Sequence, residues 1–369
     1  AVACQQIESF ERMLHDDGAL IIKLWLHVSE ETQRMQLEGK APQKQQNPRV
    51  TDTPYDLRGK YDKAIEVSEQ LILATDSSHS PWHLIEAEDR RYRDISAGEL
   101  ILKAMLAREA KPEPEEDTRT SVDIDVLGPQ PTVLDSVDLN LKLSSEEYKE
   151  ELAKYQSRLQ DLAWDAYRQN RSVVAVFEGW DAAGKGSAIR RVTRAIDPRL
   201  YRLIQFAAPT DEENAHHYLW RFWRQLQRDG RCTFFDRSWY GRVLVERVEQ
   251  FATEREWQRA YSEINQFEQQ LVEHGSIVLK FWIHIDNEEQ MRRFKAREKE
   301  PHKRHKITED DWRNRERWHD YEIAVDQMVS HTSTRYAPWT LVSGNDKPYA
   351  RIQILKTFCK NMKKALSSD

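Results

Sequence analysis

The segment from Gly179 to Ser187 has the residue types of a phosphate-binding loop. It reads Gly-Trp-Asp-Ala-Ala-Gly-Lys-Gly-Ser and follows an apolar run that begins at Val173. In a strand–loop–helix unit of this kind, backbone N–H groups and the helix N-terminus hold phosphate, and the lysine reaches the terminal phosphates. The loop is therefore predicted to bind phosphate through Gly179, Ala182, Ala183, Gly184, Lys185, Gly186 and Ser187.

One position of this loop departs from the usual pattern. Gly186 stands where a Ser or Thr hydroxyl normally ligates Mg²⁺, and the hydroxyl comes one residue later, in Ser187. Asp181, inside the loop, carries a carboxylate that could supply the missing oxygen. Because Mg²⁺ prefers oxygen ligands, we predict that Asp181 is a metal ligand.

A second aspartate, Asp236, ends the apolar run 231–235. A strand-end aspartate beside a phosphate loop typically holds Mg²⁺, directly or through water. The structural alternative is a carboxylate that caps the next turn. Arg237 follows at once, and it could reach the same phosphates or form a surface ion pair.

The segment from Arg292 to Lys306 is strongly basic, with eight Lys and Arg residues against two Glu. Most charge runs are solvated helix faces. A cationic segment over a phosphate site can instead be a lid that screens the transferred phosphoryl group from water. We place this lid near 292–311, with predicted phosphate contacts from Arg292, Arg293, Arg297, Lys303, Arg304 and Lys306.

The chain contains an internal repeat at a constant offset of 257 residues. Lys23 falls on Lys280, Trp25 on Trp282, and the pair 81–82 on the pair 338–339. Identities in rare residue types at one offset indicate duplication. The window matching the basic segment, 35–49, holds three Lys and Arg against one Glu, so the first copy has kept scaffold positions and lost cations. This divergence favours a functional role for the basic segment in the second copy.

Alternating strands and helices predict an α/β fold, with a kinase-like parallel sheet flanked by helices and the ligand at the carboxyl ends of the strands. The segment 143–147, Leu-Ser-Ser-Glu-Glu, has the residue types of a capped helix start. The expected strands are 172–178, 202–207, 231–235, 276–285 and 338–343, and the expected helices are 184–196, 213–228, 254–274, 286–299, 310–330 and 348–366.

The repeat divides the chain into three parts. Residues 1–109 are the C-terminal half of a degenerate first repeat, 110–140 are a charged linker that contains prolines, and 141–369 form a complete phosphate-loop domain. The first copy's phosphate loop would fall upstream of residue 1, so we expect a fragment of a longer tandem protein.

Composition narrows the range of functions. The net charge is −6 with 32% charged residues, which does not suit a general nucleic-acid binder. No apolar stretch approaches the roughly 18 residues of a membrane span. Three scattered cysteines show no metal-binding spacing and favour a reducing cytoplasm. Glu246, ten residues after Asp236, could face an acceptor or pair with Arg242 or Arg247.

The chain resembles the polyphosphate kinase 2 family. The matching motifs are 178–186, 207–210, 235–240, Lys306 with Asp311, Trp318 with Tyr321, 332–334, 337–339, and Lys347 with Arg351. The resemblance implies that Asp181 and Asp236 hold Mg²⁺, that Lys185 and Arg237 grip the transferred phosphates, and that Glu246 lies near the acceptor nucleotide.

The tandem arrangement implies the family branch that transfers a phosphoryl group from inorganic polyphosphate to AMP, giving ADP. The expected partners are polyphosphate and AMP or ADP, with no nucleic acid or membrane, and the duplicated copies are expected to pair and to form a homo-oligomer. Two alternatives stay open. One is a nucleoside monophosphate kinase that uses ATP, and the other is a polyphosphate-binding module without catalysis.

Overall fold

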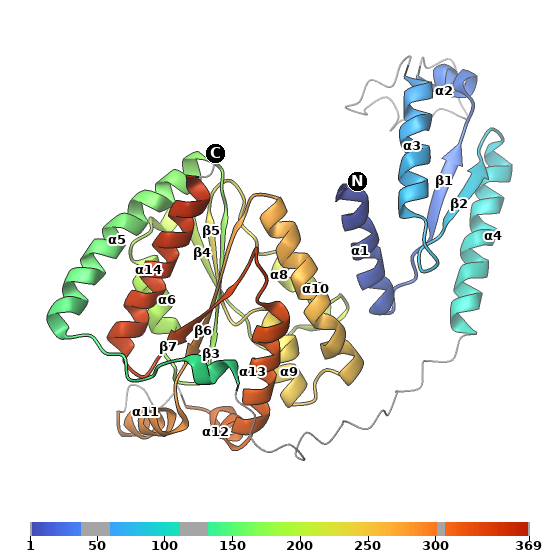
Figure 1. The fold of residues 1–369 in the computed structure, drawn as a ribbon. Helices are drawn as coiled ribbons and strands as arrows, with labels where there is room; N and C mark the ends of the chain where they lie inside the picture. The colour runs from blue at the N-terminus through green and yellow to red at the C-terminus, as the bar shows by residue number, and fades with distance from the viewer. Residues whose placement is uncertain (1, 38–59, 111–131, 301–306, 368–369) are drawn as a thin grey trace. The chain divides into compact units, whose positions relative to one another are not determined.

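The computed structural model describes residues 2–37, 60–110, 132–300 and 307–367 (Figure 1). The chain forms two compact units, Ala1–Val126 and Leu127–Asp369. Most of the expected linker, and Lys303, Arg304 and Lys306 of the expected lid, lie outside the described residues. None of the helices in the described ranges has the length and apolar character that crossing a membrane requires.

The C-terminal unit is built on one sheet of five parallel strands in the order β4-β5-β3-β6-β7. Every residue of β6, which lies between β3 and β7, is buried, as expected for a parallel sheet covered on both faces. All five expected strands are present, within two residues of their predicted ends: β3 Val173–Gly179, β4 Tyr201–Gln205, β5 Cys232–Asp236, β6 Ile277–His284 and β7 Trp339–Ser343.

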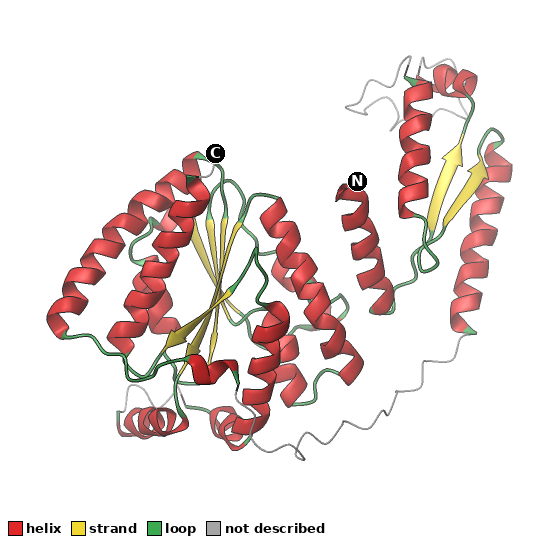
Figure 2. Ribbon diagram, in the orientation of Figure 1, coloured by secondary structure: helices red, strands yellow, loops and turns green. Residues whose placement is uncertain are grey.

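Helices cover both faces of this sheet (Figure 2). On one face α14 (Lys347–Leu366) packs along α5 (Ser145–Arg168) and against α6 (Lys185–Thr193), whereas α10 (Glu254–Glu273) and α13 (Trp318–Thr332) lie on the other. The α5 helix begins where the sequence predicts, because Ser144 and Glu147 form a reciprocal capping box.

Two predicted helices are wrong in extent. The range 213–228 contains only α7 (Asp211–Asn214) and α8 (Trp220–Trp223), because the ring of His217 accepts the Leu219 N–H in place of a helical carbonyl. The predicted helix 310–330 is two helices, α12 (Glu309–Glu316) and α13, which are separated at Arg317. At this break Trp318 stacks on Trp180 with ring centroids 3.8 Å apart.

A short 3₁₀ helix, η2 (Val133–Ser136), lies inside the range 110–140 that the sequence assigns to a linker. Leu134 is buried, the Val133 N–H donates to Asp326 Oδ1 at 2.7 Å, and Ser343 Oγ donates to the carbonyl of Asp138 at 2.8 Å. Residues 133–138 therefore pack on the C-terminal unit, which begins before residue 141.

The N-terminal unit has a two-stranded parallel sheet, with Lys23 opposite Trp82. Adding 257 to the bounds of α3, β2 and α4 gives those of α13, β7 and α14, and the pair Lys280–Trp339 repeats the strand register. The N-terminal unit thus repeats the second half of the C-terminal unit. Its elements are α1 Val2–Asp16, β1 Lys23–His27, α2 Glu30–Leu37, α3 Tyr61–Thr75, β2 Trp82–Glu86 and α4 Arg90–Glu109.

Candidate active site

The C-terminal unit has a cavity of about 880 Å³ at the carboxyl ends of β3 and β5. Basic side chains outnumber acidic ones two to one in its lining, so the cavity suits a polyanion. The acidic residues are Asp181, Asp236, Glu300 and Asp311, and the basic residues are Lys185, Arg190, Arg237, Arg292, Arg293, Arg297, Lys347 and Arg351.

The phosphate-binding loop is shaped by two glycines. Gly179 has φ 148°, and a Cβ there would lie 2.5 Å from the carbonyl oxygen of Ile283, so only glycine lets β3 end this close to β6. Gly184 has φ 114° and is the N-cap residue of α6. Lys185, Gly186 and Ser187, in the first turn of α6, line the cavity, so the positive end of this helix faces it.

Two polar side chains of this loop have clear partners. Lys185 Nζ donates to the Gly179 carbonyl at 2.5 Å, which places the ammonium group over the loop. Ser187 Oγ donates to the carbonyl of Gly184 at 2.9 Å and accepts a bond from Arg351 at 3.4 Å. The hydroxyl of Ser187, which comes one residue after the usual position, therefore bonds to the start of α6 and to Arg351.

The sheet brings the two predicted metal ligands to one cavity. Asp236 is the last residue of β5, and its Oδ2 accepts from Gln205 at 3.1 Å. A Cβ built on Gly186 would lie 3.9 Å from the same oxygen, so the glycine keeps the space beside Asp236 open. Asp181 Oδ2 accepts from Asn314 Nδ2 at 2.9 Å. Asp236 accepts the bond from Gln205 and Asp181 accepts the bond from Asn314, and each carboxylate has further lone pairs that a cation can use.

These two carboxylates suit Mg²⁺, which substrate phosphates and water help to bind, better than they suit a metal ion that protein ligands hold alone. The described ranges contain no group of three or more His, Cys, Asp and Glu that could hold a metal ion. Mg²⁺ is commonly bound through one or two carboxylates together with substrate phosphates and water. Asp311 also lines the cavity, and burial, followed by the charge of Asp181, raises the pKa of its carboxyl group.

The predicted lid arginines differ in what they can still bind. Arg292, Arg293 and Arg297 all lie on α11 (Asn287–Lys299) and line the cavity. Arg292 pairs with Glu289 at 2.6 Å, but its side chain is 70% exposed and can turn toward a ligand.

Arg293 is already fully engaged. Its five N–H donors go to Glu289 and to the carbonyls of Ala182, Ala183, Gly344 and Asn345, at 2.5 to 3.0 Å. The predicted direct phosphate contact from Arg293 is therefore corrected: the side chain clamps the phosphate loop and contributes only its charge.

Three further cations that the sequence analysis did not assign to the site also line the cavity. They are Arg190 on α6, and Lys347 and Arg351 on the first two turns of α14. Burial, together with repulsion from Arg293, lowers the pKa of Lys347 to about 8. The i,i+4 spacing of Lys347 and Arg351 on one helix face was the available signal.

Asn314 is a fourth residue that sequence reasoning missed. Its amide donates to Asp181, and its own oxygen accepts a bond from Tyr321 OH at 3.1 Å, which fixes the orientation of the amide. No local pattern points to it, because the contact with Asp181 spans 133 residues.

Glu246 lies on the short helix α9 (Val245–Val248) and is not part of the cavity lining. It pairs with Arg242 at 3.1 Å, and burial raises the pKa of its carboxyl group against the opposing effects of Arg242 and Arg221. Arg221 in turn lies over the ring of Phe206, at 4.5 Å, and Phe206 lines the cavity. Glu246 is therefore connected to the Phe206 side of the cavity through arginines.

Comparison with known proteins gives one consistent family. The family model described as polyphosphate kinase 2 matches residues 1–113 and 142–369. The chain is 48% identical to a polyphosphate:AMP phosphotransferase of Pseudomonas syringae pv. tomato, over 98% of this chain and 73% of the relative. It is 40% identical to the protein of the same name from Acinetobacter johnsonii, over 98% of this chain and 73% of that one.

A solved structure agrees with this assignment over both units. The crystal structure of a polyphosphate kinase 2 from Pseudomonas aeruginosa has a TM-score of 0.82 and 46% sequence identity, covering 98% of this chain and 71% of that one. The similarity thus extends across the N-terminal unit as well as across the unit that carries the cavity.

Proposed function

The chain belongs to the polyphosphate kinase 2 family, and we propose that it transfers the terminal phosphoryl group of inorganic polyphosphate to AMP. The products are ADP and a polyphosphate shortened by one unit. The observation that carries the proposal is the single cavity in which the phosphate loop, two aspartates and an excess of cations meet. The choice of AMP as acceptor rests on the relatives named polyphosphate:AMP phosphotransferase, whose alignments cover 98% of this chain.

The proposed chemistry assigns separate tasks to the cationic and the acidic residues of the cavity. Lys185 and the N-terminus of α6 would hold the phosphoryl group being transferred, with Arg237 beside it. Asp181 and Asp236 would hold Mg²⁺, which neutralises charge on the phosphate oxygens when bound. One P–O bond of the polyphosphate breaks as an oxygen of the AMP phosphate forms a new one. Since that oxygen is already anionic, positioning and charge neutralisation suffice without a general base.

The distribution of charge supports a long donor in preference to a triphosphate. Eight basic residues, from α6, α11, α14 and the turn after β5, line the cavity, and this much positive charge suits a donor with many phosphates. The acceptor would lie on the Phe206 side, where Arg221, Arg242 and Glu246 are found.

The direct test supplies the chain with AMP, long-chain polyphosphate and Mg²⁺, and measures ADP by chromatography. ADP that appears with polyphosphate and disappears with a chelator supports the proposal, and absence of ADP rejects it. Replacing Lys185 by Ala or Asp236 by Asn is expected to lower kcat about 100- to 1,000-fold, because each removes charge stabilisation at the transferred group.

Two comparisons identify the donor and the acceptor. ATP replaces polyphosphate in a parallel assay, and faster ADP formation from ATP would favour a nucleoside monophosphate kinase. A panel of AMP, ADP, GMP and GDP with polyphosphate as donor tests the acceptor, and we expect AMP to give the highest kcat/KM. With polyphosphate the KM should rise steeply with added salt, because many cations contact the donor.

A further inference from the structure

The turn that follows β5 holds one side chain of the cavity in an unfavourable backbone conformation. Arg237 has φ 70°, in the left-handed region that long side chains rarely adopt. A residue stays in this region only where its surroundings fix it, and such residues concentrate at functional sites. Arg237 lines the cavity next to Asp236, so whatever fixes this turn also places both side chains.

Glu178 is the residue that fixes the turn from the side of the phosphate loop. Its Oε1 accepts two hydrogen bonds from Ser238, one from the backbone N–H and one from Oγ, both at 2.8 Å. Glu178 and Ser238 are only 6% and 5% exposed. Glu178 does not line the cavity, so its carboxylate is directed at the turn and not at a ligand.

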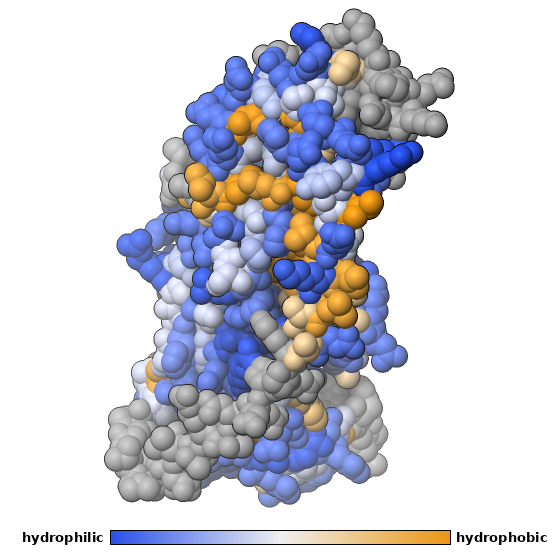
Figure 3. Space-filling model, turned by 90° about the vertical axis from the view of Figure 1, so that its right-hand side faces the viewer, coloured by the Kyte–Doolittle hydropathy of each residue, from blue (hydrophilic) through white to orange (hydrophobic). Residues whose placement is uncertain are grey.

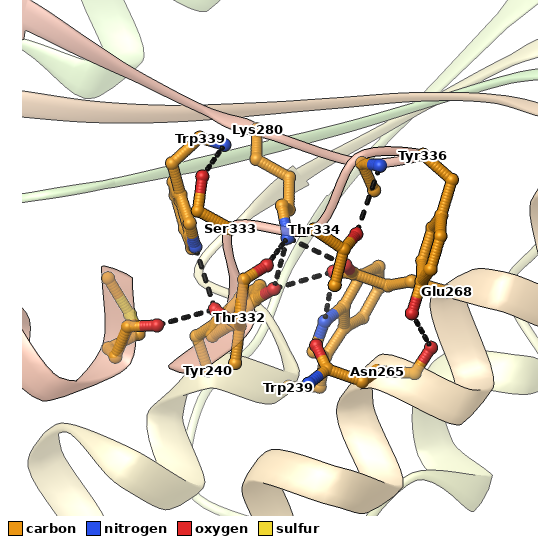
Figure 4. Close-up of polar contacts among 12 residues, drawn as sticks. Trp239, Tyr240, Asn265, Glu268, Lys280, Thr332, Ser333, Thr334, Tyr336 and Trp339 are labelled. Atoms are coloured by element: carbon orange, nitrogen blue, oxygen red, sulfur yellow. Dashed lines mark hydrogen bonds and ion pairs between the residues drawn. The ribbon is translucent and has the colours of Figure 1, made fainter. Parts of the chain in front are cut away.

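The other side of the turn is held by a buried network (Figure 4). Trp239 Nε1 and Tyr240 OH donate to Glu268 Oε1 at 3.1 and 2.7 Å, and Lys280 Nζ donates to Glu268 Oε2 at 2.7 Å. The turn is thus held at Ser238 by β3 and at Trp239 and Tyr240 by α10 and β6.

The internal repeat shows that Glu178 and the Glu268–Lys280 network, which hold the two sides of the turn, have different roles. In the N-terminal unit Lys23 Nζ donates to Glu11 at 2.8 Å and to the carbonyl of Thr75 at 2.5 Å, as Lys280 does to Glu268 and Thr332 at 2.7 Å. The lysine–glutamate network therefore belongs to the fold of both units. Glu178 instead acts on the residue that follows Asp236 and Arg237 in the cavity wall.

We propose that Glu178 is a positioning residue for phosphoryl transfer, which holds Arg237 in its left-handed conformation through the two hydrogen bonds from Ser238. This inference rests on the proposed function of the cavity. A carboxyl group is suited to the task because one of its oxygens can accept both bonds, and bonds to an ionised carboxylate are stronger than bonds to a neutral acceptor. Residues that orient a reacting group in this way commonly contribute 10- to 100-fold to activity.

A cycle of three variants in the full chain tests the inference: Glu178→Gln, Arg237→Ala and the double variant. We expect Glu178→Gln to lower kcat about 10- to 100-fold, with the KM for AMP changed less than about threefold, since Glu178 touches no substrate. Because Glu178 acts through Arg237, adding Glu178→Gln to Arg237→Ala should cost less than about twofold further. Losses that multiply in the double variant would overturn the proposal.

Two controls separate this role from folding and from the proposed function. Glu11→Gln changes a carboxylate that is also hydrogen-bonded but lies in the N-terminal unit, and kcat should stay unchanged. Thermal unfolding identifies variants that lose structure. If Glu178→Gln unfolds, Ser238→Ala keeps the backbone N–H bond to Glu178 and removes the Oγ bond, together with the bond that Ser238 Oγ accepts from the Tyr240 N–H at 3.3 Å. This variant should still lower kcat, and unchanged kcat there rejects the inference. Inactive wild-type protein would reject the proposed function, whereas active wild type with a fully active Glu178→Gln rejects only the positioning role.

Discussion

The two units of the chain share one scaffold but differ in the charges that it presents. In both, a lysine on a strand pairs with a glutamate on the preceding helix, and a tryptophan on the neighbouring strand donates to a threonine, at 2.9 Å from Trp82 and at 2.8 Å from Trp339. In the C-terminal unit α14 begins with Lys347 and Arg351, which line the cavity. The matching positions of α4 hold Arg90 and Asp94, and Asp94 pairs with Arg93.

This difference teaches that folding and phosphate binding depend on separate residues. The polar network is kept in both units because an unpaired buried charge is costly wherever it occurs. The positive charge of Arg351 is not kept in the N-terminal unit, where Asp94 stands at the matching position, and a carboxylate there would repel phosphate. Among the described residues, the phosphate loop, the two aspartates and the cavity cations lie together in the C-terminal unit.

The units differ also in what covers their helices. Ile95, Leu102 and Met105 of α4 are 62%, 57% and 57% exposed, whereas the matching Ile352, Cys359 and Met362 of α14 are buried. In the C-terminal unit α5 packs along α14. Figure 3 shows apolar side chains, in orange, grouped on part of the surface that it draws. The pairing of the two copies and a homo-oligomer both remain predictions.

Breaking the shared lysine–glutamate pair should have the largest effect, and it should differ between units. The side chains of Lys280 and Glu268 are fully buried, whereas those of Lys23 and Glu11 are 10% and 13% exposed. We expect Lys280→Met to destabilise its unit by about 3–5 kcal/mol, because Glu268 is left charged and buried. Lys23→Met should cost about 1–3 kcal/mol.

Urea unfolding of the full chain measures these costs, with hydrogen exchange in α3 and α13 reporting the two units separately. Lys103→Met, at an exposed position of α4, is the control and should change stability by less than about 0.5 kcal/mol. Equal losses for Lys280→Met and Lys23→Met would show that exposure does not distinguish the two pairs.

Exchanging the charges of α14 and α4 sharpens the comparison at the cavity. Arg351→Asp places in the C-terminal unit the charge that Asp94 has in the other. The KM for polyphosphate should rise at least about tenfold, because a like charge then faces the donor. Its dependence on salt should also become shallower, by about one power of the salt concentration or more. The reciprocal Asp94→Arg should leave both quantities unchanged, and a matching change there would give the N-terminal unit a part in donor binding.

The smallest expected effect is a pH dependence of donor binding through Lys347. Its lowered pKa, about 8, means that the cation is present below that pH and is lost above it. The KM for polyphosphate should therefore be constant at lower pH and rise by about two- to threefold as the pH passes through about 8. Lys347→Arg keeps the charge and should give a flat profile. An unchanged rise in that variant would assign the titration to another group.

Much of the fold was readable from local patterns. The apolar runs predicted all five strands, and the segment 143–147 predicted the start of α5, because hydrophobic burial and helix capping are decided within a few residues. The phosphate loop and Asp236 were visible for the same reason. The offset of 257 residues predicted a duplication, and the two units indeed pair their strands in the same register.

Only the tertiary structure decided which partners each charged or polar side chain has. The sequence places Arg293 among the phosphate ligands, but its donors reach carbonyls as far as 111 residues away. The sequence gives no partner for Asn314 or Glu178, and only the folded chain brings Asp181 and Ser238 within hydrogen-bonding distance of them. Periodicity and motif spacing describe neighbours along the chain, whereas these contacts follow from the strand order, which joins the ends of β3, β5 and β6 at one edge.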